Sequence, residues 1–162
     1  MQSRIDVQKV APKAFQPLFA LEEYIRKSSH FGKNLLELVR MRASQINGCA
    51  YCLDMHSKDA RAHGETEQRL YALNAWSETP FYSDRERAAL AWTEAVTLVS
   101  REHVPDTEYE AVRQHFSEEE LITLTLAITS INSWNRLCIS FRVVPGTYQP
   151  KPMESEVGVG AK

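Results

Sequence analysis

Apolar residues recur three and four positions apart along most of the chain, which is the spacing of a helix with one buried face. Phe15, Leu18, Leu21 and Ile25 follow this spacing and predict a helix over residues 14–28. The same pattern predicts further helices over residues 35–46, 49–63, 66–75, 84–99, 105–116 and 118–141. The sequence therefore predicts an all-α fold of about seven helices.

Several of these helices carry signals for where they begin or end. Ser83-Asp-Arg-Glu86 and Ser117-Glu-Glu-Glu120 have the spacing of capping boxes, so we expect helices to start directly behind Ser83 and Ser117. Asn34 is a candidate N-cap for the second helix. Asn47-Gly48 is a turn signal, which predicts that this helix ends there and that a new one begins near Cys49.

Length and composition are those of an ordinary globular domain. The chain has 162 residues, of which 43% are hydrophobic and 25% charged, so it can bury a core without disulfides or a metal. After Pro145 the composition turns to Pro, Gly and polar residues. We therefore expect a helical domain over residues 1–146 and a tail over residues 147–162 that is loose or docked on a neighbouring subunit.

Charge and hydrophobicity limit the partners and the compartment. A net charge of −2 offers no basic field for nucleic acid or an anionic membrane. The longest largely apolar stretch, residues 121–131, is too short and too rich in Thr to span a bilayer. The first residues lack the apolar segment of a signal peptide, so we expect a cytoplasmic protein. The reducing cytoplasm would keep its three cysteines as thiols.

The candidate chemistry lies in Cys49-Ala-Tyr-Cys52-Leu-Asp-Met-His56. On a helix, Cys49, Cys52 and His56 share one face over two turns. The start of a helix favours thiolate, and a His one turn further on can take up the thiol proton. Glu37, on the preceding helix, could fold back and orient His56. This combination of two thiols and a proton carrier is what two-electron thiol chemistry requires.

Less specific interpretations of these residues remain open. Cys49, Cys52 and His56 could hold zinc, although the sequence offers no obvious fourth ligand, or the cysteines could be inert core residues. We expect Cys138 to be a buried small hydrophobic residue, because it lies on the apolar stripe of the last helix. We expect Tyr51 to point away from the cysteines. For residues 134–136 we favour a buried hydrogen-bonded network or a subunit contact over a role in substrate binding.

The run Glu37…Cys49-x-x-Cys52-x-x-x-His56 in an all-helical chain of this length resembles the AhpD-like alkylhydroperoxidases of the carboxymuconolactone decarboxylase superfamily. The resemblance extends over roughly residues 12 to 146. It includes residues 81–90, 91–97 and 131–136, which are similar to the small, single-domain branch of that family. It therefore implies an AhpD-like helical domain.

The resemblance also implies roles for the four residues. Cys52 would attack the peroxide, and Cys49 would form a disulfide with it and face the external reductant. His56 would act as acid and base, polarised by Glu37. The best-known members carry a further His just before the second cysteine, where this chain has Tyr51.

We therefore expect a peroxidase or disulfide reductase without a cofactor or metal, acting on hydrogen peroxide or small organic hydroperoxides. The resemblance implies a thiol, lipoyl or thioredoxin-like reductant and a homo-oligomer, commonly a trimer or hexamer. Two alternatives stay open. The cysteine pair could serve a redox-sensing or structural protein without efficient turnover, or His56 and Glu37 could serve a decarboxylase-type enzyme, although the family's decarboxylases generally lack the cysteine pair.

Overall fold

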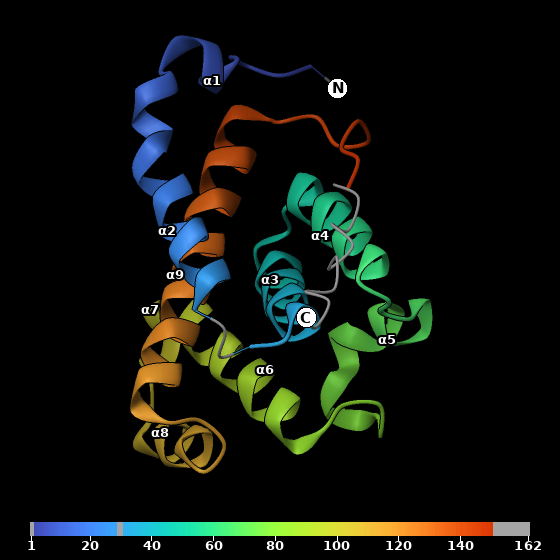
Figure 1. Cartoon of the computed structure of the whole chain (residues 1–162), viewed down its shortest axis with the longest axis vertical. Coiled ribbons are helices and arrows are strands. Elements are labelled where there is room, and N and C mark those ends of the chain that lie inside the picture. The colour runs from blue at the N-terminus through green and yellow to red at the C-terminus, as the bar shows by residue number, and fades with distance from the viewer. Residues whose placement is uncertain (1, 29–30, 151–162) are drawn as a thin grey trace, which may run out of the picture.

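The computed structural model describes residues 2–28 and 31–150, and this part of the chain is all-α without a strand (Figure 1). Its α-helices are α1 (Val7–Val10), α2 (Gln16–Lys27), α3 (Lys33–Asn47), α4 (Ala50–Ala62), α5 (Glu67–Ala72), α6 (Asp84–Thr97), α7 (Val99–Glu102), α8 (Asp106–Arg113) and α9 (Glu118–Phe141). Two 3₁₀-helices, η1 (Pro12–Phe15) and η2 (Leu73–Glu78), complete the described elements. The predicted fold class is confirmed.

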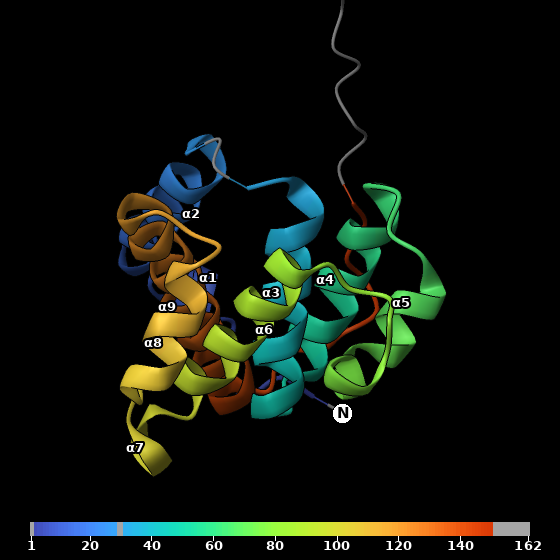
Figure 2. The same ribbon diagram turned by 90° about the horizontal axis from the view of Figure 1, so that it is seen from below.

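Helix α3 is the centre of the arrangement, because it packs against α4, α6 and α9. Helix α2 runs along α9 on one side of the molecule, and α4 lies on the other side of α3 (Figures 1 and 2). Leu38 and Val39 of α3 are completely buried, as are Leu124 and Ile128 of α9. Val39, Leu124 and Ile128 belong to one apolar cluster, which fixes α3 and α9 against each other. Leu38 belongs to a second cluster, which joins α3 to α4, α5 and α6. Helix α4 with its cysteines follows α3 directly.

The capping signals locate most helix starts correctly. Ser83 and Ser117 both form capping boxes, at the starts of α6 and α9. The prediction for Asn34 is wrong: α3 begins at Lys33, two residues before the predicted start, with Gly32 as its N-cap, and no side chain caps it. The predicted helix over residues 66–75 continues as α5 and η2, with a kink at Ala75. The four-residue helices α1 and α7 are too short to show a periodic pattern.

The beginning of the predicted tail lies against α4 of the same chain. Tyr148 donates a hydrogen bond to Asp59 over 2.7 Å, and Lys58 donates to the Tyr148 carbonyl over 3.1 Å. Residues 151–162 lie outside the described part, so the domain boundary at residue 146 stays a prediction. Among the described helices, none combines the length and the hydrophobicity needed to cross a membrane.

Candidate active site

The turn between α3 and α4 brings both cysteines to the start of α4. Gly48 ends α3 in the left-handed conformation, with φ of 69°, which costs glycine little because it has no Cβ. Cys49 is the N-cap of α4, and Cys52 lies in its first turn. Asn47 ties the turn to α9, because its amide donates to Asn132 and Asn135 over 2.9 Å each. This buried amide network holds the start of α4 beside α9.

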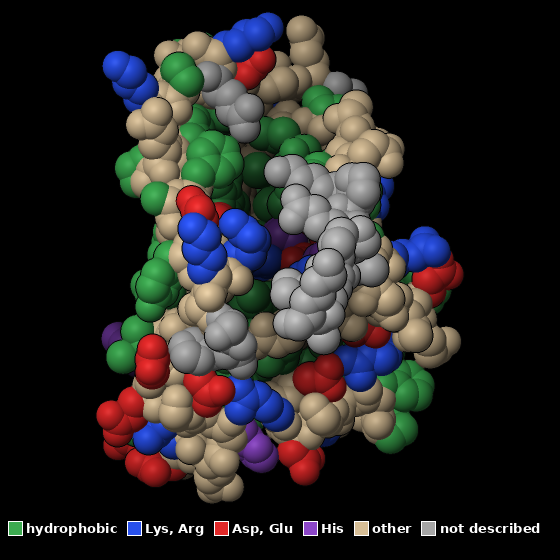
Figure 3. All heavy atoms as spheres, in the orientation of Figure 1, with side chains coloured by type: hydrophobic (Ala, Val, Ile, Leu, Met, Phe, Trp, Pro, Cys, Tyr) green, Lys and Arg blue, Asp and Glu red, His purple; other side chains and the backbone are tan. Residues whose placement is uncertain are grey.

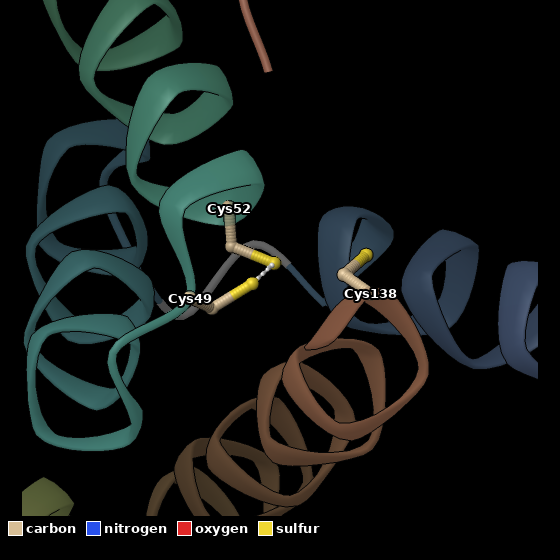
Figure 4. A group of neighbouring side chains, drawn as sticks. All are labelled: Cys49, Cys52 and Cys138. Atoms are coloured by element: carbon tan, nitrogen blue, oxygen red, sulfur yellow. Dashed lines mark hydrogen bonds between the residues drawn. The ribbon is translucent and has the colours of Figure 1, made fainter. Parts of the chain in front are cut away.

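The sulfur atoms of Cys49 and Cys52 lie within hydrogen-bonding distance, with their Sγ atoms 2.9 Å apart (Figure 4). Both side chains are 1% exposed. The third cysteine, Cys138, approaches from α9 and is 9% exposed. All three sulfur atoms lie within 4.8 Å of one another. Cys138 is buried, as predicted, but it joins the cysteine pair instead of lying apart from it.

The environment of these thiols separates their proton affinities. Hydrogen bonding with Cys138 and Cys52, and then with the Cys52 backbone N–H and the Asn135 amide, lowers the pKa of Cys49 to about 3 although burial opposes this shift. The pKa of Cys52 is raised by its hydrogen bonds with Cys138 and Cys49 and by burial. The reduced pair therefore shares one proton between its two sulfur atoms, and Cys49 is the sulfur whose surroundings favour the thiolate.

His56 and Glu37 lie together, as the sequence predicts. His56 Nδ1 is 2.7 Å from Glu37 Oε2, and both residues are buried. Burial alone would raise the pKa of Glu37, but the hydrogen bond and the charge of His56, together with Arg40, lower it below its ordinary value. The ionised carboxylate can only accept, so it places a proton on Nδ1 of His56. Nε2 is then the nitrogen left to exchange a proton.

The site contains two charged residues that the sequence did not predict, Arg40 and Glu22. Arg40 donates to Glu37 over 2.7 Å and to Glu22 of α2 over 2.8 Å. Ser130 of α9 donates to the other oxygen of Glu22 over 2.6 Å. The i,i+3 spacing of Glu37 and Arg40 could have suggested their ion pair. Glu22 gives no such signal, because its contacts depend on how α2 packs against α3 and α9.

A cavity of about 570 Å³ opens beside these residues, between α2, α4, α9 and the segment that follows α9. Cys52, His56 and Cys138 line it, whereas Cys49 does not. In the space-filling view, hydrophobic side chains line a hollow on this face, with basic, acidic and His side chains at its lower end (Figure 3). Cys52 is therefore the member of the pair on the cavity wall, and the implied exposure of Cys49 to a reductant stays a prediction.

Aromatic side chains form much of the cavity wall. Phe15 and Phe19 contact Trp134 with ring centroids 5.8 Å and 5.4 Å apart, and all three line the cavity together with Tyr51. Tyr51 thus points into the cavity, contrary to the expectation that it points away. Of residues 134–136, Asn135 belongs to the expected buried network. Trp134 instead faces the space where a substrate would lie.

Within the described part of the chain, two groups of side chains have donor atoms close enough to hold a metal ion. Cys49, Cys52 and Cys138 offer three sulfur atoms, which suit soft ions such as Cu(I) or, with a fourth ligand, zinc. Glu37, His56 and Asp59 form the second group, although Arg40 and His56 already occupy both oxygens of Glu37. If the cysteines bind zinc, the third ligand in this structure is therefore Cys138 and not His56, as the sequence had suggested.

Comparison with known proteins gives a consistent family relationship. Residues 12–95 match the model of the carboxymuconolactone decarboxylase family. The chain is 46% identical over 140 residues to the uncharacterized protein YdfG of Bacillus subtilis, covering 86% of this chain and 95% of YdfG.

Solved structures extend the comparison to the fold. ATU0492 from Agrobacterium tumefaciens, a protein of unknown function described as a candidate antioxidant defence protein AhpD, is 41% identical with a TM-score of 0.86, covering 91% of this chain and 100% of that one. The debrominase Bmp8 has the same fold, with a TM-score of 0.75 at 22% identity, covering 86% of this chain and 75% of Bmp8.

Proposed function

Because the chain belongs to the carboxymuconolactone decarboxylase family and is AhpD-like, we propose that it is a thiol-dependent peroxidase or disulfide reductase. Its substrates would be hydrogen peroxide or small organic hydroperoxides. The observation that carries this proposal is the Cys49–Cys52 pair, whose sulfur atoms lie 2.9 Å apart beside a cavity that Cys52 lines. Two thiols at this distance can lose two electrons together and form a disulfide.

Access decides which sulfur attacks the peroxide. Cys49 has the lower pKa, but of these two cysteines only Cys52 lies on the cavity wall, where a peroxide can reach it. Cys52 becomes a nucleophile when its proton moves to Cys49 across 2.9 Å or to His56 one helical turn away. Either transfer keeps the proton within the site. Release of the proton to solvent would instead leave an additional negative charge in a buried site, which costs more free energy.

The chemistry then proceeds in two steps. The Cys52 thiolate attacks one peroxide oxygen and the O–O bond breaks, which gives a sulfenic acid on Cys52 and an alcohol or water that takes up a proton. The Cys49 thiolate next attacks the Cys52 sulfur, and hydroxide leaves as water after protonation. An external dithiol or pair of thiols returns the disulfide to two thiols. A lipoyl or thioredoxin-like partner would supply these electrons.

His56 would carry the proton in both steps. Glu37 holds the proton of His56 on Nδ1, so that Nε2 can accept the thiol proton and return it to the leaving oxygen. Tyr51 occupies the position of the additional family His and lines the cavity. In this mechanism His56 is therefore the single imidazole that serves both sulfurs. We further propose a cytoplasmic homo-oligomer, a trimer or hexamer, as the working form.

Peroxide consumption with dithiothreitol or dihydrolipoamide as reductant tests the proposal. The wild-type protein should turn over many equivalents, and Cys52→Ser should lose turnover completely. Ser57→Ala is a matched control, because Ser57 lies on α4 but does not line the cavity. A protein that forms the disulfide once and then stalls would be a sensor instead. Activity on a lactone that survives Cys52→Ser would identify an acid–base enzyme that uses His56 and Glu37.

The aromatic cavity favours a second candidate, the reductive removal of a halogen from a small aromatic ring. Phe19, Tyr51 and Trp134 offer flat apolar surfaces on which such a ring could lie. Two thiols would supply the two electrons, with halide released and the ring carbon protonated. Bmp8, whose fold this chain shares, is a debrominase. Bromide release from 2,3,4-tribromopyrrole in the presence of dithiothreitol, lost in Cys52→Ser, would favour this candidate over the peroxidase.

A further inference from the structure

The third thiol, Cys138, lies beside the redox pair although the proposed mechanism uses only two cysteines. Its sulfur lies within 4.8 Å of the sulfurs of both Cys49 and Cys52. It belongs to α9, so it reaches the pair from across the site, whereas Cys49 and Cys52 both come from the start of α4 (Figure 4). The three cysteines belong to one apolar cluster.

Cys138 also differs from Cys49 in what it can reach. Cys52 and Cys138 both line the cavity, and Cys49 does not. A reductant that enters from the cavity would meet a Cys49–Cys52 disulfide only at Cys52. A disulfide between Cys52 and Cys138 would instead present both of its sulfurs to the cavity. The cavity thus favours Cys138 as the sulfur through which electrons enter.

We propose that Cys138 is a third redox-active cysteine, which forms a disulfide with Cys52 and so provides an alternative to Cys49. The proposal rests on the proposed oxidation of Cys52 by peroxide. In this step the Cys138 sulfur attacks the Cys52 sulfenic acid, the S–O bond breaks, and the thiol proton leaves with the hydroxide as water. The same disulfide forms by exchange when Cys138 loses its proton to water and attacks Cys52 in the Cys49–Cys52 disulfide, so that the S–S bond breaks and Cys49 leaves as thiolate. An external dithiol then reduces it to two thiols.

The proton affinities of the three thiols fit a conditional role. Hydrogen bonding with Cys49 raises the pKa of Cys138 to about 12, so Cys138 is a poor nucleophile while the Cys49 thiolate is present. Oxidation or substitution of Cys49 removes this cause. Cys138 then becomes the remaining thiol close to Cys52 among the described residues, and we expect it to take over the formation of the disulfide.

Substitution of Cys49 gives the decisive test. Cys49→Ser is treated with one equivalent of hydrogen peroxide, and the product is mapped by peptide mass spectrometry in the presence of dimedone, which traps sulfenic acid. We expect a Cys52–Cys138 disulfide and dimedone labelling at least about tenfold lower than in Cys49→Ser/Cys138→Ser, because a neighbouring thiol outcompetes a dissolved trap. The double variant should carry the trap on Cys52. Cys138→Ser is the matched control and should still form the Cys49–Cys52 disulfide.

Equal dimedone labelling of Cys52 in the single and double variants, without the Cys52–Cys138 disulfide, would overturn the proposal. Diamide, which oxidises thiols without peroxide chemistry, separates this result from a failure of the proposed function. If diamide forms the Cys52–Cys138 disulfide in Cys49→Ser but peroxide oxidises no variant, the result supports Cys138 as a redox-active cysteine and refutes the peroxidase activity. If Cys49→Ser fails to fold, acid-quenched mapping of partly oxidised wild-type protein decides, and the absence of the Cys52–Cys138 disulfide there would refute the inference.

Discussion

Replacing Glu37 by Gln should slow peroxide turnover by changing which nitrogen of His56 carries the proton. The carboxylate accepts from Arg40 at one oxygen and from His56 Nδ1 at the other, each over 2.7 Å. Gln has one oxygen and one NH₂ group of the same shape. If its oxygen stays with Arg40, its NH₂ faces His56 and requires Nδ1 to accept. The proton of His56 then moves to Nε2, which can no longer take a proton from a thiol.

The expected loss of stability and of activity in Glu37→Gln follows from the contacts that Arg40 and His56 retain. Arg40 still pairs with Glu22 over 2.8 Å, so the substitution does not orphan a buried charge, which would cost about 3–5 kcal/mol. The substitution turns two hydrogen bonds to a charged carboxylate into weaker ones with a neutral amide, and we expect a decrease of about 1.5–3 kcal/mol in the free energy of unfolding. Loss of general acid–base catalysis should lower kcat/KM for the peroxide about 10²-fold, equivalent to about 2.7 kcal/mol.

Glu65→Gln is the matched control for this prediction. Glu65 is 9% exposed and pairs with Arg69 over 2.9 Å, and Arg69 also retains a second carboxylate partner, Glu86. It does not line the cavity. Its substitution should therefore cost a comparable free energy of unfolding and leave kcat/KM unchanged. Steady-state peroxide consumption, urea unfolding and ¹⁵N NMR of the His56 ring form the assay. A Glu37→Gln protein with wild-type kcat/KM and its proton still on Nδ1 would refute the reasoning.

Three further predictions concern the relay and the fold. His56→Ala should lower kcat/KM for the peroxide about 10²-fold, because the site loses its proton carrier, and an unchanged kcat/KM would remove His56 from the relay. The pKa of Glu37 is lowered on folding, so its contribution to stability is present above the unfolded value of about 4.3 and is lost as the pH falls through the folded value. The difference in unfolding free energy between wild type and Glu37→Gln should therefore shrink below pH 4.3, and a constant difference would contradict it. Ser117→Ala removes the cap of α9 and should lower the unfolding free energy by about 1 kcal/mol with turnover unchanged. Circular dichroism during urea titration measures this decrease. An unchanged unfolding free energy would mean that the capping box does not stabilise the fold.

Local signals in the sequence were sufficient for the longer helices, and the turn at Asn47-Gly48 suggested that Glu37 could reach His56. The start of α6, for instance, depends on hydrogen bonds between Ser83 and Glu86, three residues apart. Asn34 fails as a cap because an N-cap residue needs an extended backbone, and here that conformation belongs to Gly32. Such a choice depends on how the chain enters α3 from α2, which no local pattern encodes.

The contacts that the sequence did not reveal join distant parts of the chain. Cys138 is 89 residues beyond Cys49, and only the packing of α9 against α3 and α4 brings its sulfur to the pair. The apolar stripe of α9 predicts that Cys138 is buried, but a stripe does not say what lies opposite. Glu22 and Ser130, whose hydrogen bond spans 108 positions, are a second example. Contacts between side chains of distant helices are therefore the part of the site that only the structure shows.

The unequal proton affinities of Cys49 and Cys52 lead to a last prediction, on the pH dependence of stability. The reduced folded pair binds one proton from about pH 3, the lowered pKa of Cys49, to well above the ordinary thiol value, because the pKa of Cys52 is raised. The unfolded chain binds two protons below about pH 8.5 and none far above it. Folding therefore releases a proton below this pH and takes one up above it.

The unfolding free energy of the reduced protein should accordingly rise with pH below about pH 8.5, by at most about 1.4 kcal/mol per pH unit from this pair, and fall above it. The oxidised protein has no thiol at either position, so it lacks this contribution. The other titrating groups are the same in both forms apart from Cys138, whose pKa is raised by Cys49 in the reduced form, and this shift adds there to the fall in stability above about pH 8.5. Urea unfolding of both forms between pH 6 and pH 10 measures the difference, with dithiothreitol present for the reduced form. Parallel curves would show that the folded pair binds as many protons as the unfolded one, and then Cys49 would not be the thiolate on which the proposed attack of Cys52 and the resolving step both depend.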